Sequence, residues 1–474
     1  MRLFRSHLVF SGALALIVSM AGCGSEQGDA GTPGAVGTTG TATGAGGTGG
    51  VGGGFGTAGA VATATGVTGT GGSAVVGAGG TAGAGGTPVG AGGTVGSGGS
   101  SGTGGGVGGS GGGGGDVDPH PPLDCGPIGA VIEDAGPVEN RVNYVIIGDG
   151  YTASEVDTTF IEHINVYMAK RFSEPIGQPY LRYRRFVNIC ALKLVSPGGI
   201  CGSSALGCCE RNPGQNTRLA ECNDNAARQA IADNIPEGFE VTWNAVVLNG
   251  DDWWNTGASL MLWSGGNQDA DGAALHEGGH GFHQLTDEYG ACGTNLVNGA
   301  SSSQDAENKW GIWMGFDQQP GTGEQGEFQC EGSNNLRPSD NSMMNSLFGE
   351  NPDTSFNSVS REKMVTDFWR FVEPIDSTVP PEGAVASPTT LRVNVVDPAV
   401  LNVDWSVDGM VVLPNGGTTF DVAAAGLMPG SHTIEARAYD NAGEDLVRYR
   451  SGGDYGRMNW ARSEQTATWT VTVP

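Results

Sequence analysis

Apolar residues between Cys125 and Pro374 follow two patterns that alternate along the chain. Short apolar runs bounded by turn residues are typical of buried strands, and apolar residues three and four apart are typical of a helix face. We therefore expect an α/β or α+β domain with a mixed sheet. The expected strands are Asn143 to Gly148, Phe186 to Val195, Trp243 to Leu248 and Ala258 to Trp263, and the expected helices are Asn223 to Ile235, Ser360 to Val372 and a segment through Val156, Phe160, Ile161, Ile164 and Met168 that follows a capping box of Thr152 and Glu155.

Beyond Pro380 and Pro381 the pattern changes to alternation with a period of two. Alternation places the apolar side chains of a strand on one face, and several short strands with Gly and Pro turns are typical of an immunoglobulin-like sandwich. We predict a small all-β domain that binds or packs against the preceding domain, with a purely structural appendage as the alternative. The alternating sets are Leu401, Val403, Trp405 and Val407; Ile434, Ala436 and Ala438; and Ala467, Trp469, Val471 and Val473.

The first residues carry an export pattern. A basic start precedes the apolar run from Leu8 to Ala21, which is too short to span a membrane comfortably. Met20-Ala21-Gly22-Cys23 resembles the bacterial lipobox, in which the cysteine is diacylated and becomes the new amino terminus. The resemblance implies lipid attachment at Cys23; the alternative is an ordinary signal peptide cut near Ala21.

Residues 23–119 are dominated by Gly, Ala, Thr, Val and Ser in loose repeats, and they hold most of the 85 glycines of the chain. Such a segment has too few large apolar residues to offset backbone entropy, so it predicts a disordered, flexible tether. Collagen is excluded because glycine does not occupy every third position and proline is scarce.

The formal charge of −27 argues against a nucleic acid partner, because an acidic surface repels phosphates. Eight cysteines follow Cys23, and an even number behind an export signal indicates disulfides. A Cys-rich metal site is the alternative, but no CxxC pair supplies the usual spacing. The pairing stays open from the sequence. These cysteines are Cys125, Cys190, Cys201, Cys208, Cys209, Cys222, Cys292 and Cys330.

The chemistry of the chain concentrates in Leu275 to Gly290. His276 and His280 stand four apart, so on a helix both can offer a ring nitrogen to one Zn²⁺. Glu277 projects beside such an ion and can carry a proton from water to a leaving amine. The alternative is a helix or loop with surface histidines and no metal, which Gly278, Gly279 and Gly281 favour because glycine disfavours helix.

Three separated motifs resemble the IgA peptidase family of bacterial zinc metallopeptidases over Val142 to Val372. The resemblance implies a zincin-like fold, one catalytic Zn²⁺ and endopeptidase activity, without implying that immunoglobulin is the substrate. The motifs are His276-Glu277-x-x-His280 with Leu285 and Asp287-Glu288-Tyr289, the upstream segment from Val145 to Thr152, and Asn341-Ser342-Met343-Met344 in the place of a methionine turn.

Catalytic zinc normally has three protein ligands and one open position. The resemblance assigns the third ligand to Asp287, with Glu288 as the second choice. His283, seven residues after His276 and on the same helical face, is a less likely third ligand. The metzincin pattern would place a glycine at 283 and the third ligand at 286, where this chain has His283 and Thr286, so the turn after His280 departs from that pattern.

Other residues near the motif receive secondary roles. Met343 and Met344 are expected to form the apolar floor of the site, with simple core packing as the alternative. Tyr289 is a candidate oxyanion donor, although packing is the commoner role of such a residue. Asp149 is expected to cap the following helix, or else to order the edge of the site. Ala258 to Trp263 is expected to be the edge strand on which a peptide aligns.

These features predict four parts: a lipoprotein signal peptide over 1–22, a tether over 23–119, a zinc metallopeptidase domain over 120–376 and an immunoglobulin-like domain over 382–474. We expect a monomeric endopeptidase that cleaves extracellular polypeptides, either secreted or held on the bacterial envelope by Cys23. The alternatives are a non-catalytic surface lipoprotein such as an adhesin, and a zinc hydrolase of amides other than protein.

Overall fold

A computed structural model describes residues 120–211, 219–252, 255–257, 260–317, 319–346, 354–386, 389–448 and 458–474. Gly115–Pro474 form one compact unit. The predicted signal peptide, Cys23 and the predicted tether lie outside the described residues. Within these ranges, none of the helices combines the length and the apolar character that a bilayer crossing requires.

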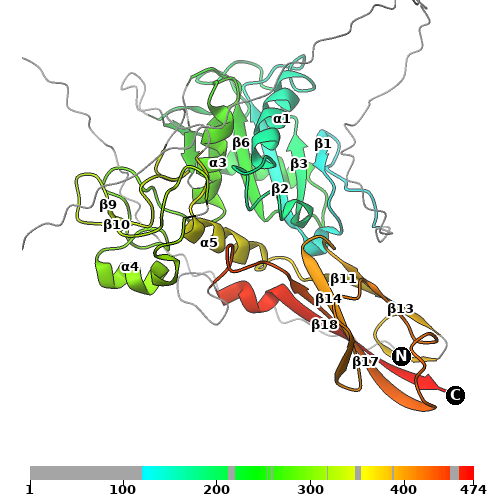
Figure 1. The fold of residues 1–474 in the computed structure, drawn as a ribbon. Helices are drawn as coiled ribbons and strands as arrows, with labels where there is room; N and C mark the ends of the chain where they lie inside the picture. The colour runs from blue at the N-terminus through cyan, green and yellow to red at the C-terminus, as the bar shows by residue number, and fades with distance from the viewer. Residues whose placement is uncertain are drawn as a thin grey trace, which may run out of the picture. The chain divides into compact units, whose positions relative to one another are not determined.

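The central part of the chain is built on a mixed six-stranded sheet with the order β1-β3-β2-β6-β8-β7 (Figure 1). The four inner strands are parallel, and the two outer strands, β1 and β7, run antiparallel to their neighbours. Every residue of β2 is buried, as expected for an inner parallel strand covered on both faces. The strands are β1 Gly129–Glu133, β2 Val142–Asp149, β3 Val187–Leu192, β6 Trp243–Leu248, β7 Asn255–Gly257 and β8 Met261–Ser264.

Two apolar cores lie on the two faces of this sheet. One core includes Ile146 of β2 with residues of α1, α3 and α5, and the other includes Val145 and Ile147 of β2 with residues of α2. Adjacent residues of β2 thus serve opposite cores, because side chains alternate along a strand. The helices are α1 Thr159–Arg171, α2 Asp224–Asn234, α3 Ala270–Gly281, α4 Ser303–Trp310 and α5 Ser358–Phe368.

The predicted elements are present, with three corrections at their ends and edges. The first helix begins at Thr159, because the main-chain N–H and the hydroxyl of Thr152 both donate to the Glu155 carboxylate within a turn that precedes it. The last helix begins two residues earlier than predicted, where the Asn357 side chain accepts from the Ser360 N–H as an N-cap. The predicted edge strand is also wrong: β8 is paired on both sides, and β7 forms the edge.

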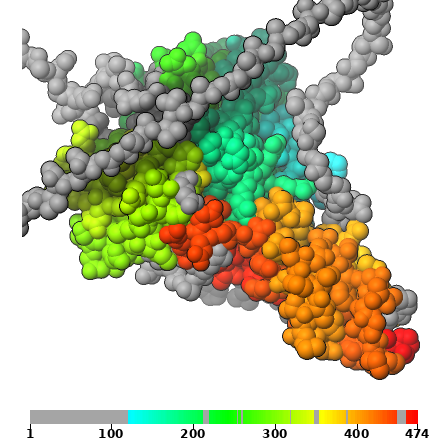
Figure 2. Space-filling view, viewed as in Figure 1, coloured from blue at the N-terminus to red at the C-terminus, as the bar shows by residue number. Residues whose placement is uncertain are grey.

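Residues beyond Pro374 form a five-stranded sheet of order β12-β18-β17-β14-β15 and a three-stranded sheet of order β11-β13-β16. The predicted alternation is confirmed in β14, whose odd-numbered residues are buried, and Trp405 stacks on Trp469 of β18 within the shared core. The orange and red segments of this sheet form one continuous surface (Figure 2). The strands are β11 Ile375–Val379, β12 Gly383–Ala386, β13 Thr390–Val395, β14 Leu401–Val407, β15 Met410–Leu413, β16 Thr419–Asp421, β17 Gly430–Asp440 and β18 Glu464–Val473.

A buried carboxylate joins these sheets to the central part of the chain. Asp440, at the end of β17, accepts hydrogen bonds from the Arg182 guanidinium at 2.8 Å, the Tyr183 hydroxyl at 2.5 Å and the Trp369 indole at 3.1 Å. These donors satisfy a charge that would otherwise be costly to bury, so the contact depends on both sides being present.

The prediction of disulfides is confirmed for the eight cysteines that follow Cys23. The pairs are Cys125–Cys190, Cys201–Cys209, Cys208–Cys222 and Cys292–Cys330. The second and third of these hold the loop that contains two short strands, and the fourth lies beside another short pair. These strands are β4 Cys209–Glu210, β5 Ala220–Glu221, β9 Phe328–Gln329 and β10 Leu336–Arg337.

Candidate metal centre

The predicted metal-binding motif lies on α3, which forms despite its glycines. A side chain at Gly278 would meet the Trp243 ring and the Tyr180 hydroxyl at 3.3 Å, and one at Gly279 would lie 2.6 Å from the Met344 sulfur. The close packing around α3 therefore depends on the absence of a side chain at both positions. The burial of the helix offsets the poor helix propensity of glycine. Gly278, Gly279 and Gly281 therefore do not prevent the helix from forming.

Three ligand atoms converge beside this helix. The Nε2 atoms of His276 and His280 are 3.1 Å apart, and Asp287 Oδ1 lies 3.1 Å from the first and 3.0 Å from the second. A tetrahedral zinc ion with ligand bonds of about 2.0–2.1 Å holds its ligand atoms about 3.3 Å apart. The spacing of the cluster therefore suits an ion of this size.

The other ring nitrogens fix the chemical state of the two imidazoles. His276 Nδ1 is 2.8 Å from the carbonyl oxygen of Met343, and His280 Nδ1 is 2.7 Å from that of Leu285. A carbonyl can only accept, so each Nδ1 carries the hydrogen in the neutral ring and each Nε2 presents a lone pair. Such outer partners normally orient metal-ligating histidines. Main-chain carbonyls carry no side-chain signal, so the sequence could not have identified them.

Asp287 and the imidazole of His280 shift one another's protonation strongly. Burial acts to raise the pKa of Asp287, but the hydrogen bonds and charges of His276 and His280 outweigh it and hold that pKa well below its usual range. Burial acts to lower the pKa of His280, but Asp287 outweighs it and raises the pKa to about 9. The carboxylate therefore attracts a positive charge into the space between the rings, and a metal ion would supply that charge.

Glu277 belongs to α3, and its side chain lies beside this cluster on the side of the edge strand β7. It is buried, and a side chain at Gly257 of β7 would lie 2.6 Å from Glu277 Oε2 and 2.5 Å from His280 Cβ. Burial raises the pKa of Glu277 above its usual value, against the opposing charges of His276 and His280. A buried carboxylate with a raised pKa next to the ligand atoms is suited to accept and return a proton.

Glu288, the second choice for third ligand, lies in a different set of contacts. Its buried carboxylate accepts from the Ser342 hydroxyl and from the side-chain amides of Asn298 and Asn357. Burial raises its pKa to about 7, although these hydrogen bonds oppose the shift. Among the described residues, the set of His, Cys, Asp and Glu side chains that could share an ion is His276, His280 and Asp287.

His283 is also placed away from the cluster, and the assumption that it shares the helical face of His276 is wrong because α3 ends at Gly281. Its Nδ1 lies 3.1 Å from Asp367 of α5, which also binds the Lys363 ammonium at 2.5 and 2.6 Å. Burial lowers the pKa of His283 to about 4, against the opposing effect of Asp367. His283 is therefore a neutral core residue.

Comparison with known proteins agrees with this geometry. Residues 130–310, which contain α3, Asp287 and Glu288, match the family model described as IgA Peptidase M64. This segment of the chain is therefore similar to the IgA peptidase M64 family. The match supports a peptidase, and the cluster of His276, His280 and Asp287 is the candidate metal site.

Two further comparisons add nothing about function. No curated protein matches the chain. A solved structure described as the fibronectin(III)-like modules of Clostridium thermocellum CbhA shares 16% identity, covers 20% of this chain and 93% of its own, and has a TM-score of 0.13. A TM-score this low does not establish a shared fold.

The methionine pair lies below the metal site of the M64 segment. Met343 and Met344 are both buried, Met343 provides the carbonyl that His276 binds, and Met344 packs its sulfur against Gly279. Tyr289 is half-buried, with its ring 6.1 Å from that of His276. Both methionines therefore contact α3 next to the candidate ligands, and the ring contact places Tyr289 there as well; the roles assigned to these three residues stay predictions.

Asp149, in the upstream motif of the M64 segment, does not cap a helix. Its buried carboxylate accepts from the main-chain N–H groups of Leu206 at 2.9 Å and Cys208 at 3.3 Å, and from the Ser196 hydroxyl at 3.2 Å. Asp149 therefore orders the disulfide-bonded loop that follows β3. The long separation of these partners in the sequence explains why a local capping role was predicted instead.

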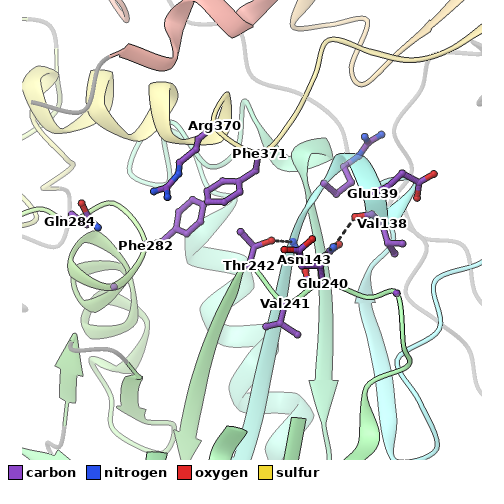
Figure 3. Close-up of a pocket in the computed structure, with 13 residues that line it drawn as sticks. Val138, Glu139, Asn143, Glu240, Val241, Thr242, Phe282, Gln284, Arg370 and Phe371 are labelled. Atoms are coloured by element: carbon purple, nitrogen blue, oxygen red, sulfur yellow. Dashed lines mark hydrogen bonds between the residues drawn. The ribbon is translucent and has the colours of Figure 1, made fainter. Parts of the chain in front are cut away.

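A pocket of about 550 Å³ opens at the carboxyl end of α3. The Phe282 and Phe371 rings stack in its wall with centroids 5.6 Å apart, Arg370 lies over Phe371, and Glu240 lines the other side (Figure 3). His276, Glu277, His280 and Asp287 are absent from its lining. The pocket is thus separate from the candidate metal ligands.

Proposed function

We propose that this chain is a zinc-dependent endopeptidase with a zincin-like catalytic domain. His276, His280 and Asp287 hold one Zn²⁺, and Glu277 acts as general base and then as general acid. Its substrates are polypeptides outside the cell, which we infer from the export pattern together with the disulfide pairs.

One observation carries the proposal: the two Nε2 lone pairs and a carboxylate oxygen meet within 3.1 Å while both Nδ1 hydrogens are committed elsewhere. Three acceptors this close require a proton or a metal ion between them. Two imidazoles with one carboxylate form a ligand set typical of catalytic zinc, whereas calcium and magnesium prefer oxygen ligands.

When held by these three residues, a zinc ion would supply Lewis-acid chemistry toward water and the substrate carbonyl. Glu277 accepts the proton of the attacking water on its carboxylate and delivers it to the amine that leaves. The carbonyls of Met343 and Leu285 keep His276 and His280 in the orientation that presents Nε2 to the site.

Strand β7 is the element that best suits substrate alignment. It is the outermost strand of the sheet, bridged at Asn255 by Leu219, and the absence of a side chain at Gly257 lets its main chain pass close to Glu277 and His280. An extended peptide added beside the Gly257 end of β7 would lie next to the proton carrier, with main-chain hydrogen bonds providing the binding. This replaces the earlier assignment of that role to 258–263.

The decisive experiment measures bound zinc and cleavage of a quenched peptide library for the wild-type protein and for Glu277→Ala. We expect both proteins to bind one zinc and only the wild type to cleave polypeptides. Zinc binding without Glu277-dependent cleavage would instead identify a non-catalytic surface protein, and activity confined to small amides would identify a different hydrolase.

Lipid attachment at Cys23 is tested separately. We expect Cys23→Ser to move the protein from the membrane fraction to the soluble fraction of the producing bacterium, with zinc binding unchanged. The same membrane content for both proteins would leave the ordinary signal peptide as the correct interpretation.

A further inference from the structure

We propose that Glu288 is a positioning residue that fixes Asp287 in place before the metal binds. The inference rests on the proposed function, because it assigns Glu288 a role in the affinity of the same zinc site. It concerns a side chain that the structure places outside the ligand cluster, yet directly next to the third ligand in the chain.

The carboxylate of Glu288 is fully buried, and both of its oxygens accept hydrogen bonds. Oε1 accepts from Asn298 at 2.9 Å and from Asn357 at 3.0 Å, and Oε2 accepts from Ser342 at 2.6 Å and from Asn357 at 3.1 Å. A buried carboxylate in a peptide-cleaving domain is expensive unless its hydrogen bonds hold something that function requires. Here they connect Glu288 to residues that lie 10, 54 and 69 positions further along the chain.

The main chain of Glu288 is held as well as its side chain. Its N–H donates to the Met344 carbonyl at 2.8 Å, and its carbonyl accepts from the Arg337 guanidinium at 2.9 Å. The preceding carbonyl in the methionine turn, that of Met343, accepts from His276. Residue 288 and the ligand His276 are therefore attached to consecutive residues of one turn.

Asn298 holds Thr286, the residue that precedes Asp287 in the chain. Its amide group accepts from the Thr286 N–H at 2.9 Å and donates to the Thr286 carbonyl at 2.8 Å, while the same side chain also donates to Glu288. Both chain neighbours of Asp287 are thus fixed by one side chain. Asp287 itself is half-buried, and its hydrogen bonds described above are to the two imidazoles.

These contacts set the distance between Asp287 and the two Nε2 atoms without any direct contact of Glu288 with the ion. Replacement by alanine removes the acceptors and leaves the donors of Ser342, Asn298 and Asn357 buried. Glutamine has nearly the same shape and keeps one acceptor, and the Ser342 hydroxyl can rotate to accept from its amide. The pair Glu288→Ala and Glu288→Gln therefore separates loss of positioning from loss of charge.

The test is zinc affinity, measured by competition with a chromophoric chelator on the full chain, together with the visible absorption of the Co²⁺-loaded protein. We expect Glu288→Ala to weaken zinc binding about 10- to 100-fold, the range found for outer partners of metal ligands, and to alter the Co²⁺ spectrum. Glu288→Gln should restore most of the affinity and the wild-type spectrum.

Asp440→Ala is the matched control, because Asp440 is also a buried carboxylate with several donors, and those donors lie away from the ligand cluster. We expect it to lower the melting temperature with zinc affinity unchanged. If Glu288→Ala fails to fold, Ser342→Ala, which removes one donor, replaces it with a smaller expected loss.

Two outcomes would count against the proposals, and they differ. Wild-type zinc affinity in the Glu288→Ala protein, or in Ser342→Ala if that variant is used, overturns the positioning role alone. Absence of zinc from the wild-type protein overturns the proposed function and the positioning role together.

Discussion

Two histidine–carboxylate clusters take their histidines from one short stretch of this chain, and they differ in how their charges are balanced. In the first, His276 and His280 face Asp287, and the described residues add no lysine or arginine to the group. In the second, His283 faces Asp367, which already holds the Lys363 ammonium. Histidine spacing alone does not distinguish them. The source of positive charge for the carboxylate does distinguish them, and it favours the first cluster as the candidate metal site.

The largest expected effect comes from replacing one histidine of each cluster by alanine, in two separate variants. His280→Ala should weaken zinc binding by more than about 100-fold, because it removes a direct ligand rather than a residue that only orients one. Peptide cleavage should be lost with the zinc. His283→Ala should keep zinc and lose stability, because it leaves a cavity and removes the partner of Asp367. Zinc content after dialysis and denaturant unfolding measure the two effects. Loss of zinc in His283→Ala alone would reverse the comparison.

The two carboxylates provide the next test. Asp287→Asn should weaken zinc binding by at least about 10- to 100-fold, because an amide is a poorer ligand than a carboxylate. Asp367→Asn should leave zinc affinity unchanged and destabilise the fold, because Lys363 stays buried without its counter-charge. Chelator competition and urea unfolding of the two variants give the answer. Equal zinc affinity in both would refute the assignment of Asp287.

The difference in acid stability between the wild type and a His283 variant reports on the second cluster. The pKa of His283 is about 4 in the fold and about 6.5 when unfolded, so between these values the unfolded chain binds more protons. Stability should therefore fall as pH decreases from 6.5 to 4, by at most about 3 kcal/mol from this group. Urea unfolding in the presence of EDTA at pH 7 and pH 4.5 measures the change, and His283→Gln should show a smaller one. An equal pH dependence in both proteins would contradict the neutral state of His283.

The smallest expected effect concerns the packing of α3. Gly279→Ala should destabilise the protein, because about 1–3 kcal/mol of overpacking against Met344 exceeds the gain of about 1 kcal/mol in helix propensity. Gly199→Ala is the control, since a side chain there meets nothing within 4 Å. Thermal unfolding compares them. A Gly279→Ala protein as stable as Gly199→Ala would show that the helix does not need this glycine.

Local patterns predicted much of the fold and the centre of the site. The run Trp243–Leu248 forms β6 with the predicted bounds, and Asn223 caps α2 because its side chain accepts from the N–H groups of Asn225 and Ala226. The pair His276 and His280 needs only the helical repeat to be placed on one face.

What the sequence left open depended on distant partners. Glu288 accepts a hydrogen bond from Asn357, 69 residues further along the chain, and His283 binds Asp367, 84 residues further along. The roles of both residues therefore follow from the packing of α5. The edge position of β7 likewise depends on the order of strands in the sheet, which residue patterns in one strand do not contain.

The carbonyl oxygens that orient His276 and His280 belong to the main chain, so no exchange of side chains at positions 343 or 285 can delete them. Different apolar side chains at these two buried positions would therefore leave both hydrogen bonds in place, as long as the path of the backbone is kept. Insertions, deletions or prolines in the two turns are the changes that would disable the centre, and a survey of natural variation should find them excluded there.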